Sequence, residues 1–287
     1  MSMDVFYVLD PGFGSHLQDR GRSGWRRFGV PVGGVMDQHA AEMANHLMGN
    51  SPDAAVLEMC FQGAKLAALR PVWVAVTGAD AGGNIQMWRS VQLQTDDVVG
   101  FPRSQHGMWT YLAVEGGFTD DLTLDSLGAS PRVRLGRVLT RGAILRRSEL
   151  SSFELPRGVG ARSAPLPDRR LYSHPPALRV WPGPQWDCFP DAVRAAFFHN
   201  SWKVSSRSDR TGYRLEGQRL RPPPGQLVSE PVRVGTIQVP EDGMPIVTLN
   251  DGPTVGGYAK LGVLDSESLS WFVQCRAGQA VRFEPAS

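Results

Sequence analysis

The stretch PVRVGTIQVPEDGMPIVTLNDGPTVGGYAKLG, residues 231–262, sets two short apolar segments beside three clusters of turn-forming residues. Short runs rich in Val, Ile and Thr that are bounded by Gly, Pro, Asn and Asp are typical of strands joined by tight turns. The stretch therefore predicts a β unit. It also gathers polar side chains suited to a ligand site: Gln238, Asp242, Asp251, Thr254, Tyr258 and Lys260.

The composition extends this β interpretation to the whole chain of 287 residues. It contains 32 glycines and 22 prolines, which is above average usage and favours short strands and tight turns. The chain has 41% hydrophobic residues and a net charge of +2. This composition indicates neither a disordered chain nor a surface charged strongly enough to bind polyanions. No secretory signal opens the sequence, and no apolar run approaches the roughly 18 residues of a membrane span. We therefore expect a cytoplasmic protein.

Strand patterns recur along both halves of the chain, whereas helical patterns are few. Helices are expected after Asp37, a candidate N-cap, at 191–198, and from about 265. Strands are expected in the opening VFYVL, at 54–61, 71–77, 91–101 and 109–114, and in a hairpin at 138–147. This pattern predicts a mainly β protein with a few short helices.

The second half repeats features of the first half in the same order. SDRTGYRLEG at 208–217 parallels QDRGRSGWRRFG at 18–29, and a proline precedes a glycine pair by the same interval at 71–83 and 245–257. Because turn composition alone rarely gives a repeated order, we infer two related β lobes from an internal duplication. Residues 151–176 lose apolar periodicity and read as the connection, which predicts domains at 1–172 and 173–287.

Two Asp-Arg pairs, Asp19-Arg20 and Asp209-Arg210, occupy equivalent places in the repeats. A carboxylate beside a guanidinium can fix a loop through an ion pair. Alternatively, the arginine can bind a substrate carboxylate, phosphate or carbamate. Tyr213 and Arg214 strengthen the binding alternative in the second copy.

The glycine pair Gly256-Gly257 lets the backbone approach a ligand closely and is followed by Tyr258 and Lys260. Residues two apart on a strand share a face, so a phenol and an ammonium are expected side by side, suited to stabilising an oxyanion. The alternative is an edge strand protected by polar side chains. Gln238 alternates with apolar neighbours and belongs either to this site or to solvated surface, and Asp242 is expected in a hairpin turn.

Other candidate chemistry is weaker. The three cysteines, Cys60, Cys188 and Cys275, are expected to be buried free thiols, and no flanking signature supports the alternative of a catalytic cysteine. His39 and His46 lack a third ligand, so no metal site is expected. Without a phosphate-binding loop, ATP binding by this chain alone is not expected. The six arginines within 132–147 favour a solvated face or a protein contact over a nucleic-acid site.

Longer motifs connect the chain to a known family. They are QDRGRSGWRRFGVPVGGVMD from Gln18, GNSPDAAVLE from Gly49, VTGAD from Val76, YLAVEGGF from Tyr111, SDRTGYRLEG from Ser208, GTIQVPEDGMPIV from Gly235 and GGYAK from Gly256. With these motifs the chain resembles the allophanate hydrolase subunit 2 family over nearly its whole length. That family is also called the biotin-dependent carboxyltransferase or KipA-like family, and it includes the C component of bacterial ATP-dependent 5-oxoprolinase.

The resemblance implies two tandem cyclophilin-like β-barrel lobes and a partner of the subunit 1, or KipI-like, family. This chain departs from the family pattern Asp-Arg-Gln-Thr-Thr-Gly-Gly-Tyr-Pro-Lys at Gly252, Pro253 and Val255. It also has Gly33 where a serine is usual and Val35 where an alanine is usual.

Three functions follow from the resemblance as hypotheses. The first is a subunit of a 5-oxoprolinase-type amidohydrolase, which with a KipI-like sister and a third subunit opens the lactam of 5-oxo-L-proline to L-glutamate. The second is a carboxyltransferase subunit acting on urea or another small amide, as in a urea carboxylase and allophanate hydrolase system. The third is a non-catalytic regulator that binds a KipI-like kinase inhibitor.

In the first hypothesis, the ligand site lies between the lobes. Arg210 and Arg214 bind the substrate carboxylate, Tyr258 and Lys260 stabilise oxyanion charge, and Asp209 and Asp251 orient those cations. The other expected substrate-binding residues are Asp19, Arg20, Tyr213, Gln238, Thr254, Gly256 and Gly257. ATP, or carboxybiotin in the second hypothesis, would be supplied through partner subunits, and no nucleic-acid or membrane partner is expected.

Overall fold

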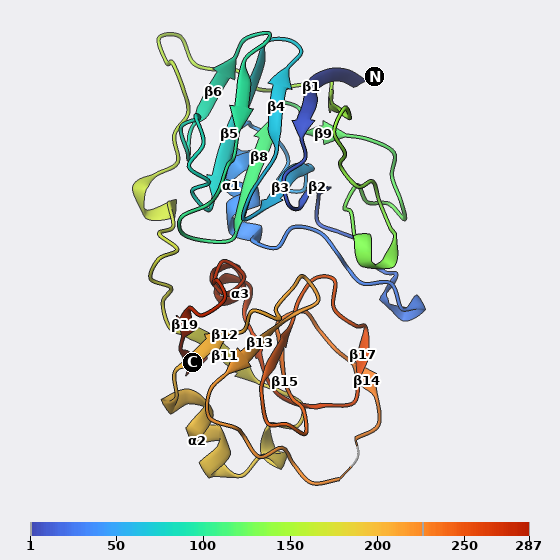
Figure 1. Ribbon diagram of the computed structural model, residues 1–287, viewed down its shortest axis with the longest axis vertical. Coiled ribbons are helices and arrows are strands. Elements are labelled where there is room, and N and C mark those ends of the chain that lie inside the picture. The colour runs from blue at the N-terminus through green and yellow to red at the C-terminus, as the bar shows by residue number, and fades with distance from the viewer. Residues whose placement is uncertain (1, 226, 287) are drawn as a thin grey trace. The chain divides into compact units, whose positions relative to one another are not determined.

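The computed structural model describes residues 2–225 and 227–286 and is built mainly from β-strands (Figure 1). The chain divides into two units. The first comprises Met1–Arg22 and Gly33–Ser173, and the second comprises Ser23–Val32 and His174–Ser287. The sequence predicted one boundary near residue 172. The structure adds a short crossing segment, 23–32, which we call the arm and which belongs with the second unit although its neighbours in sequence lie in the first.

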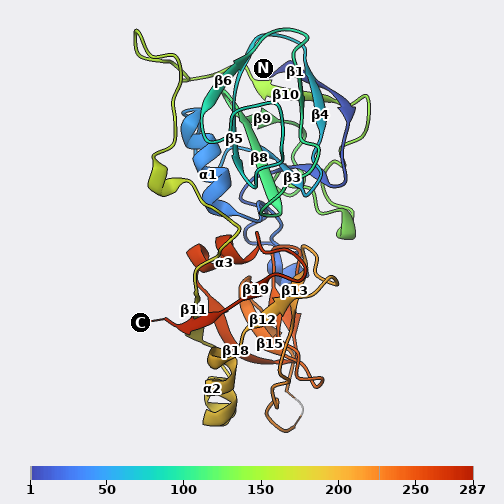
Figure 2. The same ribbon diagram turned by 60° about the vertical axis from the view of Figure 1, so that its left-hand side comes forward.

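The first unit contains two five-stranded antiparallel sheets that curve around an apolar core (Figures 1 and 2). Buried core side chains include Phe6, Leu66, Val74, Phe101 and Leu112. One sheet has the order β2 (Ser15–Gln18), β3 (Val56–Cys60), β8 (Trp109–Val114), β5 (Val72–Gly78) and β6 (Ser90–Leu93). The other has the order β7 (Val98–Gly100), β4 (Lys65–Ala68), β1 (Ser2–Asp10), β10 (Ile144–Ser148) and β9 (Phe118–Thr119).

The helix of the first unit, α1 (Gln38–Leu47), covers β5 and β8 (Figure 1). Asp37 is its N-cap, as predicted, and its side chain accepts a hydrogen bond from the Ala40 backbone N–H at 3.1 Å. The Thr77 hydroxyl of β5 donates to the Ala40 carbonyl at 2.6 Å. The helix is therefore held on the sheet by the Thr77 hydrogen bond and by its buried alanine face.

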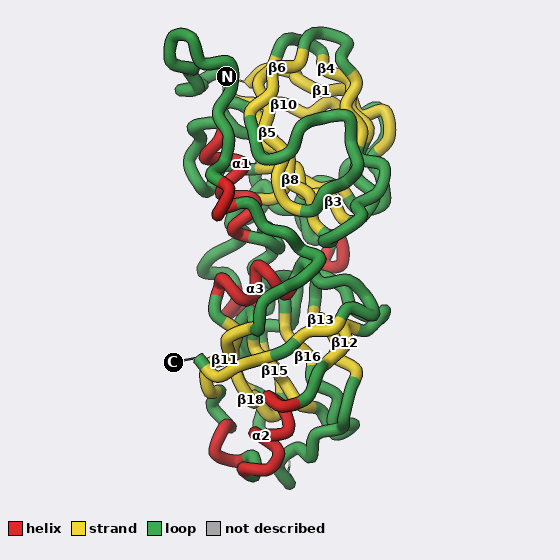
Figure 3. Tube along the Cα trace, turned by 90° about the vertical axis from the view of Figure 1, so that its left-hand side faces the viewer, coloured by secondary structure: helices red, strands yellow, loops and turns green. Residues whose placement is uncertain are grey.

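The second unit is one eight-stranded, nearly closed sheet with a two-stranded ribbon (Figure 3). The sheet order is β19 (Ala280–Val281), β12 (Trp202–Val204), β13 (Gly212–Glu216), β16 (Ile246–Thr248), β15 (Thr236–Val239), β18 (Ala259–Leu264), β11 (Leu178–Pro182) and β20 (Phe283–Pro285). The ribbon pairs β14 (Glu230–Pro231) with β17 (Val255–Gly256). Helix α2 (Asp191–His199) packs near β20, and α3 (Ser266–Phe272) packs beside β11.

Most predicted elements are confirmed, including both helices of the second half, but two strand predictions are wrong. The expected hairpin at 138–147 forms only β10, because Gly142 and Ala143 exchange backbone hydrogen bonds with Val8 of β1. The expected strand at 91–101 is divided between the two sheets, because the chain turns at Asp96, where φ is 69°.

Single-turn 3-10 helices occupy Arg26–Phe28, Pro131–Val133, Leu166–Asp168 and Trp186–Cys188. Across the described residues, no helix has the length and apolar character needed to cross a membrane. The internal duplication stays a prediction from the sequence.

Candidate functional site

The predicted site residues are distributed over both units. Asp19 and Arg20 lie in the first unit, and the other eleven lie in the second.

Lys260 is buried on β18, with 3% of its side chain exposed, and its charge is compensated. Its Nζ donates to Glu230 Oε1 at 2.8 Å and approaches the Gly256 carbonyl at 3.5 Å. Gln185 completes the arrangement, since its Nε2 donates to the same Glu230 oxygen at 2.7 Å and its Oε1 accepts from the Lys260 backbone N–H at 3.1 Å. The hydrogen bond from Lys260, followed by that from Gln185, lowers the pKa of Glu230.

The β14–β17 ribbon holds both acceptors of Lys260, because Glu230 pairs with Gly256 across it. A Cβ at position 256 would lie 2.9 Å from Gln238 Oε1 and 3.0 Å from Val232 Cγ2, so a larger residue would have to displace these side chains. Gln238 is 5% exposed and donates to Thr248 Oγ1 at 2.7 Å. The alternative that Gln238 belongs to solvated surface is therefore wrong.

Tyr258 does not share a strand face with Lys260. Strand β18 begins at Ala259, so the two-residue alternation does not extend to Tyr258, which is 49% exposed. Tyr258 instead lines an open pocket of about 230 Å³ together with Pro222, Leu227, Val239 and Glu241. The prediction that the phenol and the ammonium lie on one strand face is therefore wrong, because the turn before β18 interrupts the alternation.

Arg210 forms a buried ion pair with Asp251. Its Nε donates to Asp251 Oδ2 at 2.9 Å and its Nη2 to Oδ1 at 3.4 Å, and the side chains are 14% and 4% exposed. Asp209 accepts hydrogen bonds from the backbone and hydroxyl of Thr211. The carboxylate that orients Arg210 is thus Asp251, from a segment distant in sequence.

The two residues after Gly212 differ in environment. Tyr213 is buried, and its hydroxyl donates to the Val273 carbonyl at 2.8 Å. Arg214, next on β13, is exposed. Thr254 contributes its backbone, since its carbonyl accepts from the Val232 N–H at 3.0 Å.

Arg26 of the arm also reaches this carbonyl, a contact that sequence reasoning missed. Its Nη2 donates to the Val232 carbonyl and, at 3.4 Å, to the Thr254 carbonyl. Burial lowers the pKa of Arg26. Glu230 and Gln185 were missed as well. The only sequence signal for Glu230 was its position one residue before the stretch at 231–262.

In the first unit, Asp19 and Arg20 have separate roles. Asp19 accepts from the Ser126 hydroxyl at 2.6 Å and from the Leu127 N–H at 2.7 Å, which fixes that loop. Arg20 is more than half exposed and forms ion pairs with Glu42 and Asp53. Asp19 thus fixes a loop, as the structural alternative expected, but through Ser126 and Leu127 and not through Arg20.

A buried polar network lies nearby in the same unit. Glu58 Oε2 accepts from the Tyr111 hydroxyl at 2.9 Å and from the Met36 N–H at 2.6 Å. The Asp37 N–H donates to the Tyr111 oxygen at 2.7 Å, and the Tyr172 hydroxyl donates to Asp37 Oδ2 at 2.8 Å. Burial, and then the charges of Glu58 and Asp37, raise the pKa of Tyr111 well above its usual value. The phenol is therefore held neutral and acts as a donor.

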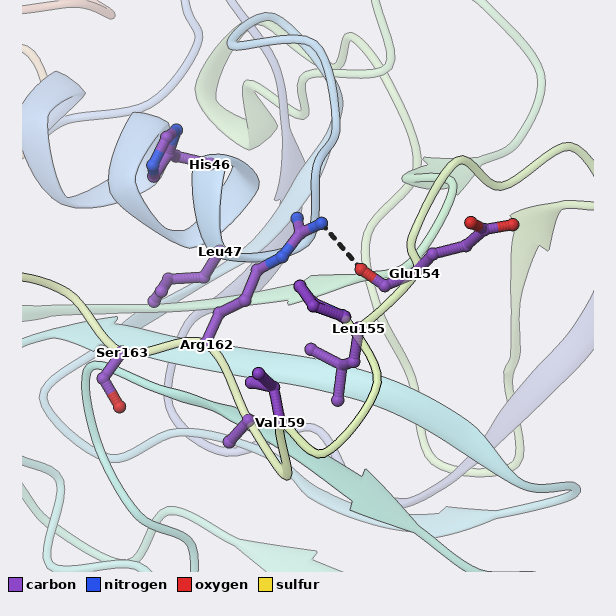
Figure 4. A pocket seen from close by; sticks show the side chains of 9 residues that line it. His46, Leu47, Glu154, Leu155, Val159, Arg162 and Ser163 are labelled. Carbon is purple, nitrogen blue, oxygen red and sulfur yellow. Dashed lines mark hydrogen bonds between the residues drawn. The ribbon is translucent and has the colours of Figure 1, made fainter.

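The first unit also contains an open pocket of about 590 Å³ between the end of α1 and residues 154–163 (Figure 4). Arg162 crosses it and donates from Nη2 to the Glu154 carbonyl at 2.9 Å, while the Glu154 carboxylate points away. Leu155 and Val159 give this pocket an apolar wall. Because Arg162 also lies 4.9 Å from the Phe153 ring, it serves to hold this connecting segment in place.

Two further predictions concerned metal binding and the cysteines. No group of three His, Cys, Asp or Glu side chains within residues 2–225 and 227–286 is arranged to hold a metal ion. The prediction of buried thiols is confirmed only for Cys275, because Cys188 is exposed and Cys60 is half-buried. In the second unit, Lys260 and Arg26 lie against backbone carbonyls of Gly256, Val232 and Thr254, and cations placed in this way are suited to binding carbonyl or carboxylate oxygens.

Comparison with solved structures places the fold in the carboxyltransferase class. The crystal structure of TTHA0988 is 31% identical with a TM-score of 0.87, over 98% of this chain and 56% of that chain. The crystal structure of the Kluyveromyces lactis urea carboxylase is 25% identical with a TM-score of 0.85, over 100% of this chain and 28% of that chain. This chain thus spans about half the length of TTHA0988.

Sequence comparison then gives the family. The chain belongs to the family "carboxyltransferase domain, subdomain A and B", whose model matches residues 28–285. It is 31% identical to the 5-oxoprolinase C component of Haemophilus influenzae, over 98% of this chain and 91% of the relative, and equally identical to that of Escherichia coli. It is 28% identical to urea amidolyase of Lachancea kluyveri, over 99% of this chain but 17% of that protein.

Proposed function

We propose that this chain is a subunit of an ATP-dependent 5-oxoprolinase-type amidohydrolase that converts 5-oxo-L-proline to L-glutamate with a KipI-like sister subunit. One observation carries the proposal: the similarity to the C component of 5-oxoprolinase extends over nearly the full length of both proteins. The match to urea amidolyase, by contrast, leaves most of that protein outside the alignment.

In this proposal, Lys260 polarises the lactam carbonyl. Its Nζ has three protons, of which Glu230 and the Gly256 carbonyl engage two. The remaining N–H can stabilise the oxyanion that forms when the lactam is activated and opened. Gln238, packed against Gly256, would hold the glycine backbone close to the substrate. ATP would be handled by the partner subunits.

A second candidate is transfer of a carboxyl group from a biotin carrier to a small amide. The similarity to urea amidolyase favours it, because this chain aligns with one part of that longer protein. The same lysine would then polarise the carbonyl of the amide acceptor. A third candidate, a non-catalytic KipA-like regulator of a KipI-like inhibitor, is favoured by the departures at Gly252, Pro253 and Val255.

Coexpression of the chain with the subunits encoded beside it tests these candidates. The lactamase function predicts ATP hydrolysis that depends on 5-oxoproline and requires this chain. Lys260→Met should abolish that activity, whereas Lys203→Met, an exposed lysine on β12, should leave it unchanged. Activity that persists without this chain would refute the subunit role, and carboxylation of urea by a biotin carrier would favour the transferase.

A further inference from the structure

Arg26 has an unusual charge environment within the second unit. It begins the 3-10 helix Arg26–Phe28 of the arm and is half-buried. Among the described residues, no carboxylate lies within ion-pairing distance of its guanidinium, and both of its protein hydrogen bonds leave from Nη2. The N–H groups on Nε and Nη1 therefore make no hydrogen bond to the described residues and can donate to a ligand.

Three other partly buried arginines of this unit, Arg179, Arg194 and Arg210, have a carboxylate partner. Asp251 neutralises Arg210, and Asp187 and Asp191 flank Arg194. The lowered pKa of Arg26, caused by burial, agrees with a cation that lacks a counter-charge. A guanidinium that is anchored and half-buried with no carboxylate beside it is preorganised to bind an anion through its free edge.

The position of Arg26 links it to Lys260. The carbonyl groups that anchor Arg26 belong to Val232 and Thr254, which follow β14 and precede β17. Gly256, whose carbonyl Lys260 approaches, lies two residues beyond Thr254. Two residues of extended chain span about 7 Å. The carbonyl groups that Arg26 and Lys260 contact are thus separated by a span similar to the length of a small cyclic amide that carries a carboxylate.

We propose that Arg26 binds the carboxylate of the small-molecule substrate, through Nε and Nη1, at the end of the β14–β17 ribbon. This inference rests on the proposed function for the identity of that substrate. It assigns to the arm the carboxylate recognition that the sequence had suggested for Arg210 and Arg214. Asp251 compensates the charge of Arg210, and Arg214 is exposed.

Protection from arginine modification tests the binding directly. The coexpressed complex is treated with phenylglyoxal, and modification of Arg26 is followed by peptide mass spectrometry with exposed Arg27 as the internal control. We expect 5-oxoproline, but not uncharged 2-pyrrolidinone, to protect Arg26 and to leave Arg27 reactive. Equal protection by both compounds, or protection by neither, would overturn the subsite. Protection without turnover would instead overturn the proposed function and leave the subsite standing.

Steady-state kinetics separate recognition from a purely structural role. In Arg26→Gln the KM for 5-oxoproline should rise about tenfold to a hundredfold, the range expected for a charge-assisted hydrogen bond. The same variant should leave turnover of 2-pyrrolidinone nearly unchanged. Arg27→Gln should leave the kinetics with both substrates unchanged. If Arg26→Gln raised the KM for both compounds equally, Arg26 would serve only to hold the arm in place, and the proposal would be wrong.

Discussion

Replacing Asp251 by Asn should lower the free energy of unfolding of the second unit by about 3 kcal/mol, because it removes the buried negative charge that faces the Arg210 guanidinium. Both side chains are largely shielded, with 14% of Arg210 and 4% of Asp251 exposed, so water can compensate little of the loss. The amide still offers one acceptor, which places the expected cost at the lower end for a broken buried pair.

The same change at other carboxylates provides graded controls. Glu230→Gln should cost about 1–2 kcal/mol, because Glu230 is 39% exposed while its partner Lys260 is buried. Asp191→Asn should cost at most about 0.5 kcal/mol, because Asp191 is 92% exposed in its ion pair with Arg194. The loss in the free energy of unfolding is therefore expected to increase with the burial of the ion pair and not with the number of ion pairs.

Hydrogen exchange measured by mass spectrometry can resolve these costs within one unit, through the slowest-exchanging amides of β16 and β18. The double variant Arg210→Met/Asp251→Leu should recover most of the stability that Asp251→Asn loses, since no unpaired charge remains. Equal losses at Asp251 and Asp191, or a double variant that is no more stable than Asp251→Asn, would refute the reasoning.

Two further predictions concern the titratable groups. Because the pKa of Tyr111 is raised in the folded state, its contribution to stability is complete below about pH 10 and is lost as the pH rises above that value, by up to about 1.4 kcal/mol per pH unit. Urea unfolding from pH 9 to 11 should show a shallower decline for Tyr111→Phe than for Tyr7→Phe. Cys188 should react with a thiol reagent in the native protein, whereas Cys275, whose pKa burial raises to about 12, should react only on unfolding.

Local signals in the sequence were sufficient for much of the fold. The cap at Asp37 and the buried spacing of Ala40 and Ala44 gave the first helix, and alternation between turn clusters gave most strands. These features are decided within a few residues. The position of β10 was not, because the partner of Gly142 is Val8, far away in the chain.

The candidate site shows the same division between local and long-range information. Lys260 and Gly256 were visible in one stretch, but the counter-charge Glu230, its second donor Gln185 and the arm residue Arg26 depend on pairing between distant segments. Residue spacing cannot report which carboxylate neutralises which cation. The sequence named Asp209 and Asp251 as orienting carboxylates without indicating which cation each one faces, and the structure pairs Asp251 with Arg210.

The departure from the family pattern after Asp251 is built into the backbone and is not a simple loss of side chains. A Cβ at Gly252 would lie 2.5 Å from Thr248 Cγ2, 2.7 Å from the Thr211 carbonyl oxygen and 2.8 Å from that of Leu249. The arginine typical of the family therefore cannot be accommodated here unless the turn moves. Since the Leu249 N–H donates to the Thr211 carbonyl, moving this turn would disturb the segment that aligns Asp251 with its arginine. The proposed function therefore assigns carbonyl polarisation to the Lys260 side of the unit, where the buried lysine contacts Glu230 and the Gly256 carbonyl.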